Sequence, residues 1–480
     1  EGYNEDSQAV WDAFERYGVK DYTVIERGGV NFAVFGILGV DSDSCAPMSG
    51  MILEDPIAVA QETVNVAVKD CKDTYGADPI VICLSHSGTE DGKGEDYELA
   101  KAVTGIDVII SGHTHTTLGE PIQVNDTIIA APGEYCRYLG VIKLSSKGEL
   151  KSYELIPVDE TVAEDPAVSA LVEDYKTKVE EDYLSRYGFT FDQILVHNTY
   201  KFDTVDEVYG TQHESTLGNL FSDAYKAAVE KATGKKVAAA LTASGVIRAS
   251  MPVGDVTVSD VFNAASLGVG TEGELVAIYV TGKDLKNAIE LDASVQPLMT
   301  TAQLFMSGVE YSFNTNRMIF NKVDYAMLRN DDGTLTAIED DQLYYIVAGM
   351  YMGQMLGSAE ETSMGILTIT PRDEQGNSIA VDELVNYVVK DENGNPVKEW
   401  YAIASYLDAM GGEMDTRYER PDGRKVVYAS WNPVSLLRNA NIFTYIVLAV
   451  ILLLVAVIVL VTVKIIRKVK RKKQLQAQGA

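Results

Sequence analysis

The sequence predicts an α/β protein with two globular units and one membrane-spanning helix near its C-terminus. Three observations lead to this prediction. Apolar strands alternate with helical patterns over the first 150 residues, a polar helical stretch separates them from a second mixed region, and residues 442–463 carry no charge. A chain of 480 residues is also too long for a single hydrophobic core.

The first unit is predicted over residues 1–150, and its apolar runs and helical patterns alternate along the chain. Such alternation is typical of a parallel sheet, in which ligand sites gather at the carboxyl ends of the strands. A hairpin-rich segment is predicted to follow. The predicted strands are 31–40, 79–86, 106–113, 127–133 and 139–150, and the predicted helices are 55–76 and 97–105.

A polar stretch with apolar residues at helical spacing, residues 160–187, predicts a connector helix within the segment 151–189. The second unit is predicted over residues 190–430. It combines a helix at 216–234 with strands such as 273–282 and 343–352.

The apolar segment 442–463 would span about 33 Å as a helix, which is enough to cross a bilayer core. The basic tail that follows, residues 464–480, begins with "KIIRKVKRKK" and predicts a cytoplasmic C-terminus. The N-terminal body is then expected outside the cell, as in a single-pass protein of the cell membrane.

The composition excludes some classes of function. Seventy acidic against 40 basic residues give a net charge of −30, so no broad basic surface is available and no nucleic-acid partner is expected. The four cysteines lack CxxC spacing, which argues against a disulfide framework or a zinc knuckle. Cys83 lies in the apolar run "PIVICL" and is predicted to be a small buried side chain.

Three of the five histidines end two consecutive predicted strands. His86 ends the first strand, and His113 and His115 end the second, directly after Gly112. Neighbouring strands lie about 5 Å apart, so the three imidazoles can converge on one ion. Neutral imidazole binds Zn, Mn, Fe or Ni. The alternative is that these histidines begin exposed loops, but the concentration of three in one place favours a metal site.

The stretch "VICLSHSGTEDGKGEDYELAKAVTGIDVIISGHTHT" resembles part of a known family, and "APGEYCRYLGVIKL" continues the resemblance. Both are similar to the C-terminal half of the calcineurin-like metallophosphoesterase domain of the bifunctional metallophosphatase/5'-nucleotidase family. Later, "TLGNLFSDA", "ASGVIRASMPVGDVTVSDVF" and "VTGKDLKNAIE" follow the order of that family's C-terminal substrate domain. The resemblance implies part of a metallophosphoesterase sandwich, followed by a mixed α+β 5'-nucleotidase C-terminal domain.

The resemblance also implies chemistry. It matches His86, His113 and His115 to metal ligands of a site with two divalent ions, Zn or Mn. Such an ion pair activates a water and neutralises charge on a phosphoryl group. The implied activity is hydrolysis of small phosphoesters outside the cell, of the 5'-nucleotidase or 2',3'-cyclic-nucleotide phosphodiesterase type.

The sequence departs from the family's pattern at its beginning. The blocks Asp-x-His, Gly-Asp and Gly-Asn-His-Glu or -Asp should come before "YTVIERGGVNFAVFGILGV", and none of them does. An initiator Met and a signal peptide are absent as well. We therefore expect an N-terminally truncated piece of a longer enzyme. Its catalytic residues would lie upstream of residue 1, and the piece alone would be inactive.

The substrate motifs match only partly. Arg248 matches a motif arginine that can bind phosphate or carboxylate, although a structural ion pair would also explain it. The motif's asparagine is replaced by Ala243 or Ser244. Leu267 stands where one stacking aromatic is expected, and Tyr351 is the candidate for the other, or else a core tyrosine.

Base stacking contributes about 1–3 kcal/mol, so nucleotide preference should be weak without the first aromatic. Two alternatives to a surface 5'-nucleotidase therefore stay open. One is a non-catalytic surface binding module on a degenerate phosphoesterase scaffold. The other is a phosphoesterase that acts on lipid head groups or wall polymers.

Overall fold

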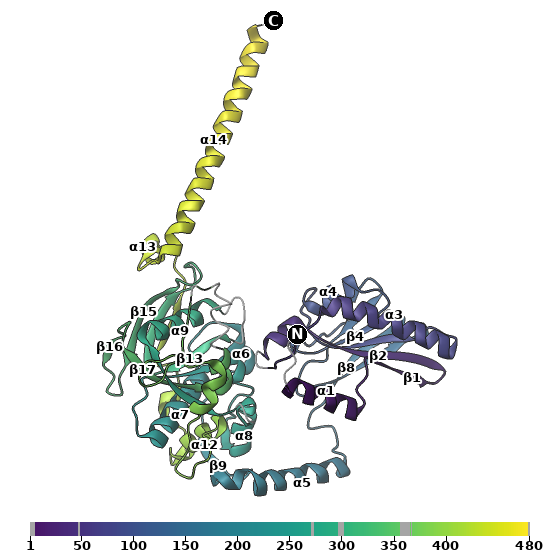
Figure 1. Ribbon diagram of the computed structural model, residues 1–480, viewed down its shortest axis with the longest axis horizontal. Helices are drawn as coiled ribbons and strands as arrows, with labels where there is room; N and C mark the ends of the chain where they lie inside the picture. The colour runs from purple at the N-terminus through teal and green to yellow at the C-terminus, as the bar shows by residue number, and fades with distance from the viewer. Residues whose placement is uncertain are drawn as a thin grey trace. The chain divides into compact units, whose positions relative to one another are not determined.

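The computed structural model describes residues 5–46, 49–269, 273–295, 302–355, 365 and 367–478 (Figure 1). The chain divides into two compact units, Glu1–Ala170 and Leu171–Ala480. The boundary falls inside helix α5 (Pro166–Asp182). Residues 151–157 of the predicted connector are not helical, because they pair with the preceding strand as part of a hairpin.

The first unit is built on a six-stranded sheet with the order β1-β2-β3-β4-β6-β5. Strands β2, β3, β4 and β6 run parallel, and β1 and β5 add antiparallel edges. The strands are β1 (Tyr22–Arg27), β2 (Val30–Leu38), β3 (Ile80–His86), β4 (Val108–Ser111), β5 (Ile122–Val124) and β6 (Thr127–Ala130). This arrangement confirms the predicted α/β class.

Two helices cover one face of this sheet, α3 (Pro56–Tyr75) and α4 (Glu95–Ala102) (Figure 1). Ala60, Val64 and Ala67 recur along one side of α3 and pack in the core with Cys83, which is fully buried as predicted. The other elements of the unit are α1 (Glu5–Tyr17), α2 (Val40–Ser44), β7 (Tyr138–Leu144) and β8 (Leu150–Pro157).

In the part of the second unit that the structure describes there are three sheets, with the orders β12-β17-β10-β13, β11-β9-β18 and β16-β15-β14-β19. Their strands are β9 (Ile194–Asn198), β10 (Ala239–Ala243), β11 (Gly254–Thr257), β12 (Leu275–Thr281), β13 (Leu304–Ser307), β14 (Val309–Asn314), β15 (Val323–Arg329), β16 (Leu335–Ala337), β17 (Leu343–Gly349), β18 (Gly412–Glu413) and β19 (Lys425–Tyr428). The predicted strand 343–352 was wrong at its end, because it stops at Gly349 and a helix begins at Met350.

The helices of the second unit pack around these sheets (Figure 1). They are α6 (Val205–Gly210), α7 (Thr216–Thr233), α8 (Val258–Ala264), α9 (Gly282–Val295), α10 (Met350–Met355), α12 (Glu399–Asp408) and α13 (Pro433–Leu437). Short 3₁₀ turns include η2 (Ser244–Val246) and η3 (Ser266–Val269). Helix α7 matches the helix predicted at 216–234. Its ends follow from a Ser215 cap and from Gly234 in the left-handed conformation.

Helix α14 (Ile442–Gln478) is the last element of the second unit. Its segment Thr444–Val469 is long and apolar enough to cross a membrane by length and composition, with a mean hydropathy of 3.6. The start of the helix is attached to an earlier segment of this unit. The Asn441 side chain accepts the Thr444 N–H and donates to the Phe320 carbonyl.

A buried ion pair joins several elements of the second unit. The Lys425 ammonium lies 2.9 Å from the Asp292 carboxylate, and both side chains are almost fully buried. Asp292 also accepts hydrogen bonds from the Tyr311 hydroxyl at 2.8 Å and the Leu304 N–H at 2.7 Å. Lys425 donates in addition to the side chain of Gln303 and to the Leu304 carbonyl, both at 3.0 Å. The pair therefore ties α9, β14 and β19 together.

We expect Asp292→Asn to lower the free energy of unfolding of the second unit by about 3–5 kcal/mol, because it leaves the Lys425 charge buried without its counter-ion. The measurement is urea unfolding followed by tryptophan fluorescence, since Trp400 is buried in this unit. The matched control is Asp340→Asn in the exposed pair with Lys286, in the same unit, for which we expect a change under about 0.5 kcal/mol. Equal effects of the two substitutions would contradict this account.

Candidate metal centre

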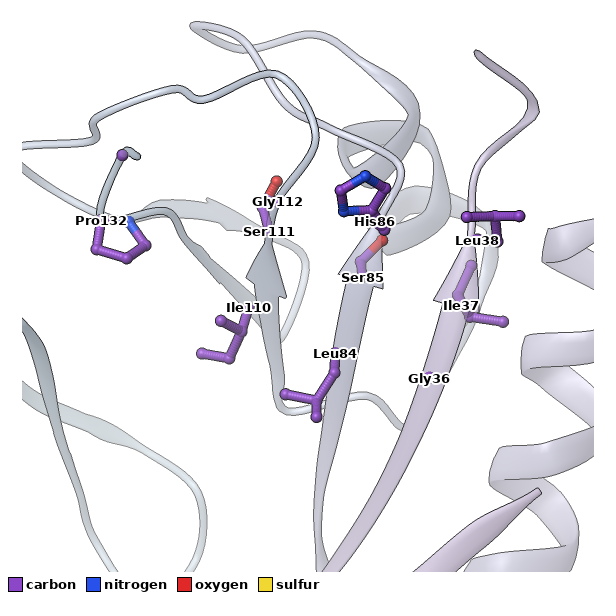
Figure 2. Close-up of a pocket in the computed structure, with 11 residues that line it drawn as sticks. Gly36, Ile37, Leu38, Leu84, Ser85, His86, Ile110, Ser111, Gly112 and Pro132 are labelled. Atoms are coloured by element: carbon purple, nitrogen blue, oxygen red, sulfur yellow. The ribbon is translucent and has the colours of Figure 1, made fainter. Parts of the chain in front are cut away.

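The carboxyl ends of the parallel strands β2, β3 and β4 form one edge of the sheet, where the sequence predicts His86 and His113 to lie. We call it the histidine edge. Leu38 at the end of β2 pairs with His86 at the end of β3, and Ser85 pairs with Ser111 at the end of β4. Figure 2 shows His86 at the tip of its strand, between Leu38 and the turn at Gly112. The register therefore brings the residues that follow each strand to one edge of the sheet.

Gly112 allows the close approach of the two histidine segments. A Cβ atom at this position would lie 3.2 Å from the Ser85 carbonyl oxygen and 3.3 Å from the His86 Nδ1. Both contacts are tighter than ordinary van der Waals contact, so a side chain here would push the two segments apart.

The structure brings His86 and His113 side by side, with ring centroids 5.0 Å apart and ring planes inclined by 55°. His113 and His115 both have a left-handed backbone, with φ values of 71° and 56°. This conformation costs a non-glycine residue about 1–3 kcal/mol and is found preferentially at functional sites. The strain is therefore in keeping with a functional role for this turn.

Each histidine of the Gly-His-x-His motif contacts a carboxylate. His113 Nε2 lies 2.8 Å from Asp41 Oδ2, and His115 Nδ1 lies 2.6 Å from Glu134 Oε2. His115 is also next to Tyr135, with ring centroids 6.5 Å apart. In each ring, one nitrogen therefore faces a carboxylate, and the opposite nitrogen, Nδ1 of His113 or Nε2 of His115, points away from it.

The electrostatic surroundings keep His86 neutral at neutral pH. Partial burial and the proximity of His113 lower the pKa of His86, and the Asp96 carboxylate opposes this effect. A neutral imidazole is the form that binds metal ions. Asp96 itself is fully buried, which raises its pKa, and its carboxylate accepts the Ser85 hydroxyl at 2.6 Å.

A hollow of about 580 Å³ lies on the sheet beside His86 (Figure 2). Its floor is largely apolar, and polar groups enter it mainly at the strand ends. It is lined by Gly36, Ile37, Leu38, Leu84, Ser85, His86, Ile110, Ser111, Gly112, Pro132 and Gly133. A polar edge above an apolar floor is typical of small-molecule sites.

Sequence reasoning missed the acidic residues of this edge. Asp41 and Glu134 contact the two histidines, and the Glu95 carboxylate accepts the N–H groups of Val40 and Asp41 at 2.7 and 2.8 Å. One pattern pointed to Asp41: it closely follows the predicted strand 31–40, and residues after parallel strands gather at one edge. Glu134 follows the predicted strand 127–133 in the same way.

The predicted substrate residues lie in the second unit. Arg248 follows η2 and is half-buried; its N–H donates to the Ala264 carbonyl at 2.8 Å, and its guanidinium lies 3.5 Å from the Gly245 carbonyl. Tyr351 lies on α10 and is half-buried. Leu267 lies on η3 with 49% of its surface exposed.

The segments that carry Leu267 and Tyr351 meet at one buried carboxyl group. A Cβ atom on either Gly268 or Gly349 would collide with the Glu399 side chain. Complete burial raises the pKa of Glu399 to about 7, and the Tyr225 hydroxyl donates to it at 3.0 Å. The structure therefore packs the two predicted segments against a common group.

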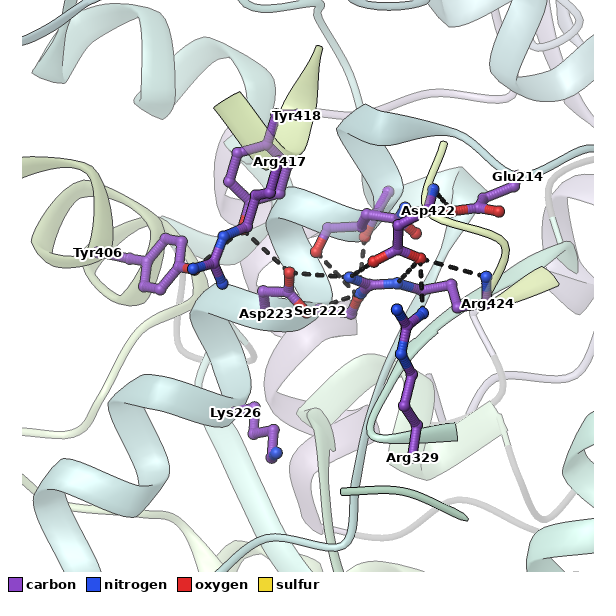
Figure 3. Close-up of polar contacts among 12 residues, drawn as sticks. Glu214, Ser222, Asp223, Lys226, Arg329, Tyr406, Arg417, Tyr418, Asp422 and Arg424 are labelled. Atoms are coloured by element: carbon purple, nitrogen blue, oxygen red, sulfur yellow. Dashed lines mark hydrogen bonds and ion pairs between the residues drawn. The ribbon is translucent and has the colours of Figure 1, made fainter. Parts of the chain in front are cut away.

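Glu214, which precedes the motif "TLGNLFSDA", has a structural role (Figure 3). Its carboxylate accepts the N–H groups of Asp422 and Gly423 at 2.8 and 2.9 Å. Next to it, Arg424 forms a two-pronged pair with Asp223 at 2.7 and 3.2 Å and contacts Asp422 at 2.8 Å. These contacts fasten the loop before β19 to α7.

Comparison with known proteins points to one family. The sequence profile of the 5'-nucleotidase C-terminal domain matches residues 198–358. The trifunctional nucleotide phosphoesterase protein YfkN of Bacillus subtilis is 29% identical over 70% of this chain and 22% of its own length. The 5'-nucleotidase of Diplobatis ommata is 26% identical over 70% of this chain and 60% of its own length.

The chain spans 22% to 64% of the length of the first three relatives, the third being an apyrase of Anopheles gambiae. Among solved structures, the 5'-nucleotidase precursor from Thermus thermophilus has a TM-score of 0.63 at 23% identity, with coverage of 85% of this chain and 75% of that one. The fold is therefore that of 5'-nucleotidases. Residues 198–358 belong to the 5'-nucleotidase C-terminal domain family, and the chain is homologous to metallophosphoesterase/5'-nucleotidase proteins.

Proposed function

We propose that the protein to which this chain belongs is a metal-dependent phosphoester hydrolase of the cell surface, of the 5'-nucleotidase or 2',3'-cyclic-nucleotide phosphodiesterase type. The observation that carries the proposal is the pair of histidines, His86 and His113, at the ends of adjacent parallel strands. The names of the relatives support the substrate class, since they include a nucleotide phosphoesterase and 5'-nucleotidases.

The residues fit divalent ions such as Zn or Mn, which would be held by His86, His113 and His115. Metal-bound histidines usually donate their second ring N–H to a carboxylate, and Glu134 stands in that position beside His115. When bound, the ions would activate a water and neutralise charge on the phosphoryl group. The protein's own side chains orient the ligands, and His86 stays neutral.

The substrate would be bound by residues of the second unit. A guanidinium such as that of Arg248 can bind phosphate with two parallel hydrogen bonds, and Tyr351 offers an aromatic face for a base. The exposed Leu267 gives an apolar contact but no stacking face. We therefore propose a small phosphoester as substrate, with only weak selection for the base.

Helix α14 would anchor the protein in the membrane. Seven lysines and arginines within residues 464–473 favour the cytoplasm for the C-terminal side of the helix. The residues of both units that precede α14 would then face the outside of the cell.

The second candidate is a non-catalytic surface binding module. One observation favours it, namely Leu267 where the family's pattern has a stacking aromatic. The candidates differ in what His113 does: a hydrolase loses turnover without it, whereas a binding module keeps its ligand affinity.

The proposal is tested by hydrolysis assays with AMP, 2',3'-cyclic AMP and bis(p-nitrophenyl) phosphate on protein isolated from the cells that make it. We expect turnover with added Mn or Zn that a chelator abolishes. We expect His113→Ala to lower kcat/KM by at least about 100-fold, since loss of a group that merely orients a ligand already costs about 10–100-fold. His197→Ala, at an exposed histidine of the second unit, is the control. Metal-dependent turnover that is unchanged in His113→Ala would overturn the proposal.

We also expect Glu134→Gln to weaken Zn or Mn binding by about 10–100-fold, because His115 loses the charged partner that orients its ring. Calorimetric titration measures the affinity. Glu149→Gln, in the exposed pair with Lys151, should leave it unchanged. Equal metal affinity of the wild type and Glu134→Gln would show that Glu134 and His115 are not part of the metal site.

A further inference from the structure

Helix α2 is fastened to the histidine edge, although no sequence motif pointed to it. The Gly39 N–H donates to the His86 carbonyl at 3.2 Å, and the Ser42 hydroxyl donates to the same carbonyl. From the other side, the Glu95 carboxylate holds the N–H groups of Val40 and Asp41. Four hydrogen bonds thus fix the position of a helix of only five residues.

This attachment places a mixed set of metal-binding side chains together. Asp41 and Cys45 are four residues apart, so they share one side of the helical turn. One ligand atom from each of Asp41, Cys45 and His113 lies within 4.8 Å of the other two. The ring of His86 lies 5.0 Å from that of His113.

We propose that Asp41, Cys45 and His113 form a cation site for a borderline-soft divalent ion such as Zn²⁺, with His86 as the nearest additional donor. A set of one carboxylate, one thiolate and imidazole nitrogens matches the ligands that zinc takes in proteins. The inference shares His113 with the proposed function, but it requires neither phosphoester hydrolysis nor His115.

The His113–Asp41 pair needs only a small adjustment to hold an ion. Ligand atoms at about 2.0–2.1 Å from a tetrahedral zinc are about 3.3 Å apart, whereas His113 Nε2 and Asp41 Oδ2 are 2.8 Å apart. The Asp41 side chain is 60% exposed and can withdraw by this difference. His113, with 17% of its side chain exposed, stays in place. Binding releases the thiol proton of Cys45 to solvent, so that the thiolate sulfur becomes the ligand.

A titration of the full chain with Co²⁺ in detergent tests the site, because thiolate coordination to Co²⁺ produces near-ultraviolet charge-transfer absorption that imidazole and carboxylate ligands do not. We expect this band to appear and to saturate at one equivalent. Cys45→Ser should abolish it, and Asp41→Asn should weaken Co²⁺ binding by about 10-fold or more. Cys136→Ser, at an exposed cysteine that is not part of the set, should retain the band.

Each other outcome is decisive. Bound Co²⁺ without the band, or a band that persists in Cys45→Ser, overturns the inference. If Co²⁺ binds without the band and this binding is lost in His86→Ala and His113→Ala, the thiolate site is excluded but the histidine site of the proposed function still stands. If the chain binds no Co²⁺ and its circular dichroism is that of a folded protein, the inference falls whatever the outcome of the hydrolysis assays.

Discussion

The parallel register of β2, β3 and β4 is the constraint on which the candidate metal centre depends. Because Leu38 pairs with His86 and Ser85 pairs with Ser111, the three strands end at the same level. The residues after each strand are therefore neighbours, even though Asp41 and His113 are 72 positions apart in the sequence. A shift of one residue in either pairing would turn His86 to the opposite face of the sheet.

The carboxylates around this edge have two different roles. Asp41 and Glu134 face imidazole rings, whereas Glu95 holds backbone N–H groups of α2 and so keeps Asp41 in place. The left-handed backbone at His113 and His115 is tolerated because these contacts offset part of its free-energy cost.

Much of the first unit could be predicted from the sequence, because apolar runs of strand length alternate with helical patterns. The histidine edge followed from the rule that parallel strands end together. The contacts of Asp41 and Glu134 could not be predicted, because they depend on the backbone angles of tight turns. The spacing of apolar residues in the sequence predicts helices and strands but not these angles. In the second unit, the strand predicted to include Tyr351 ends at Gly349, where Glu399 packs against the backbone and α10 begins.

The assignment of His86 and His113 as metal ligands is the central claim. Anomalous X-ray diffraction from crystals grown with Zn²⁺ tests it most directly. The account predicts an anomalous peak about 2.0–2.1 Å from an imidazole nitrogen of both His86 and His113. Crystals of the folded protein soaked in Zn²⁺ that show no peak at this edge of the sheet would contradict it.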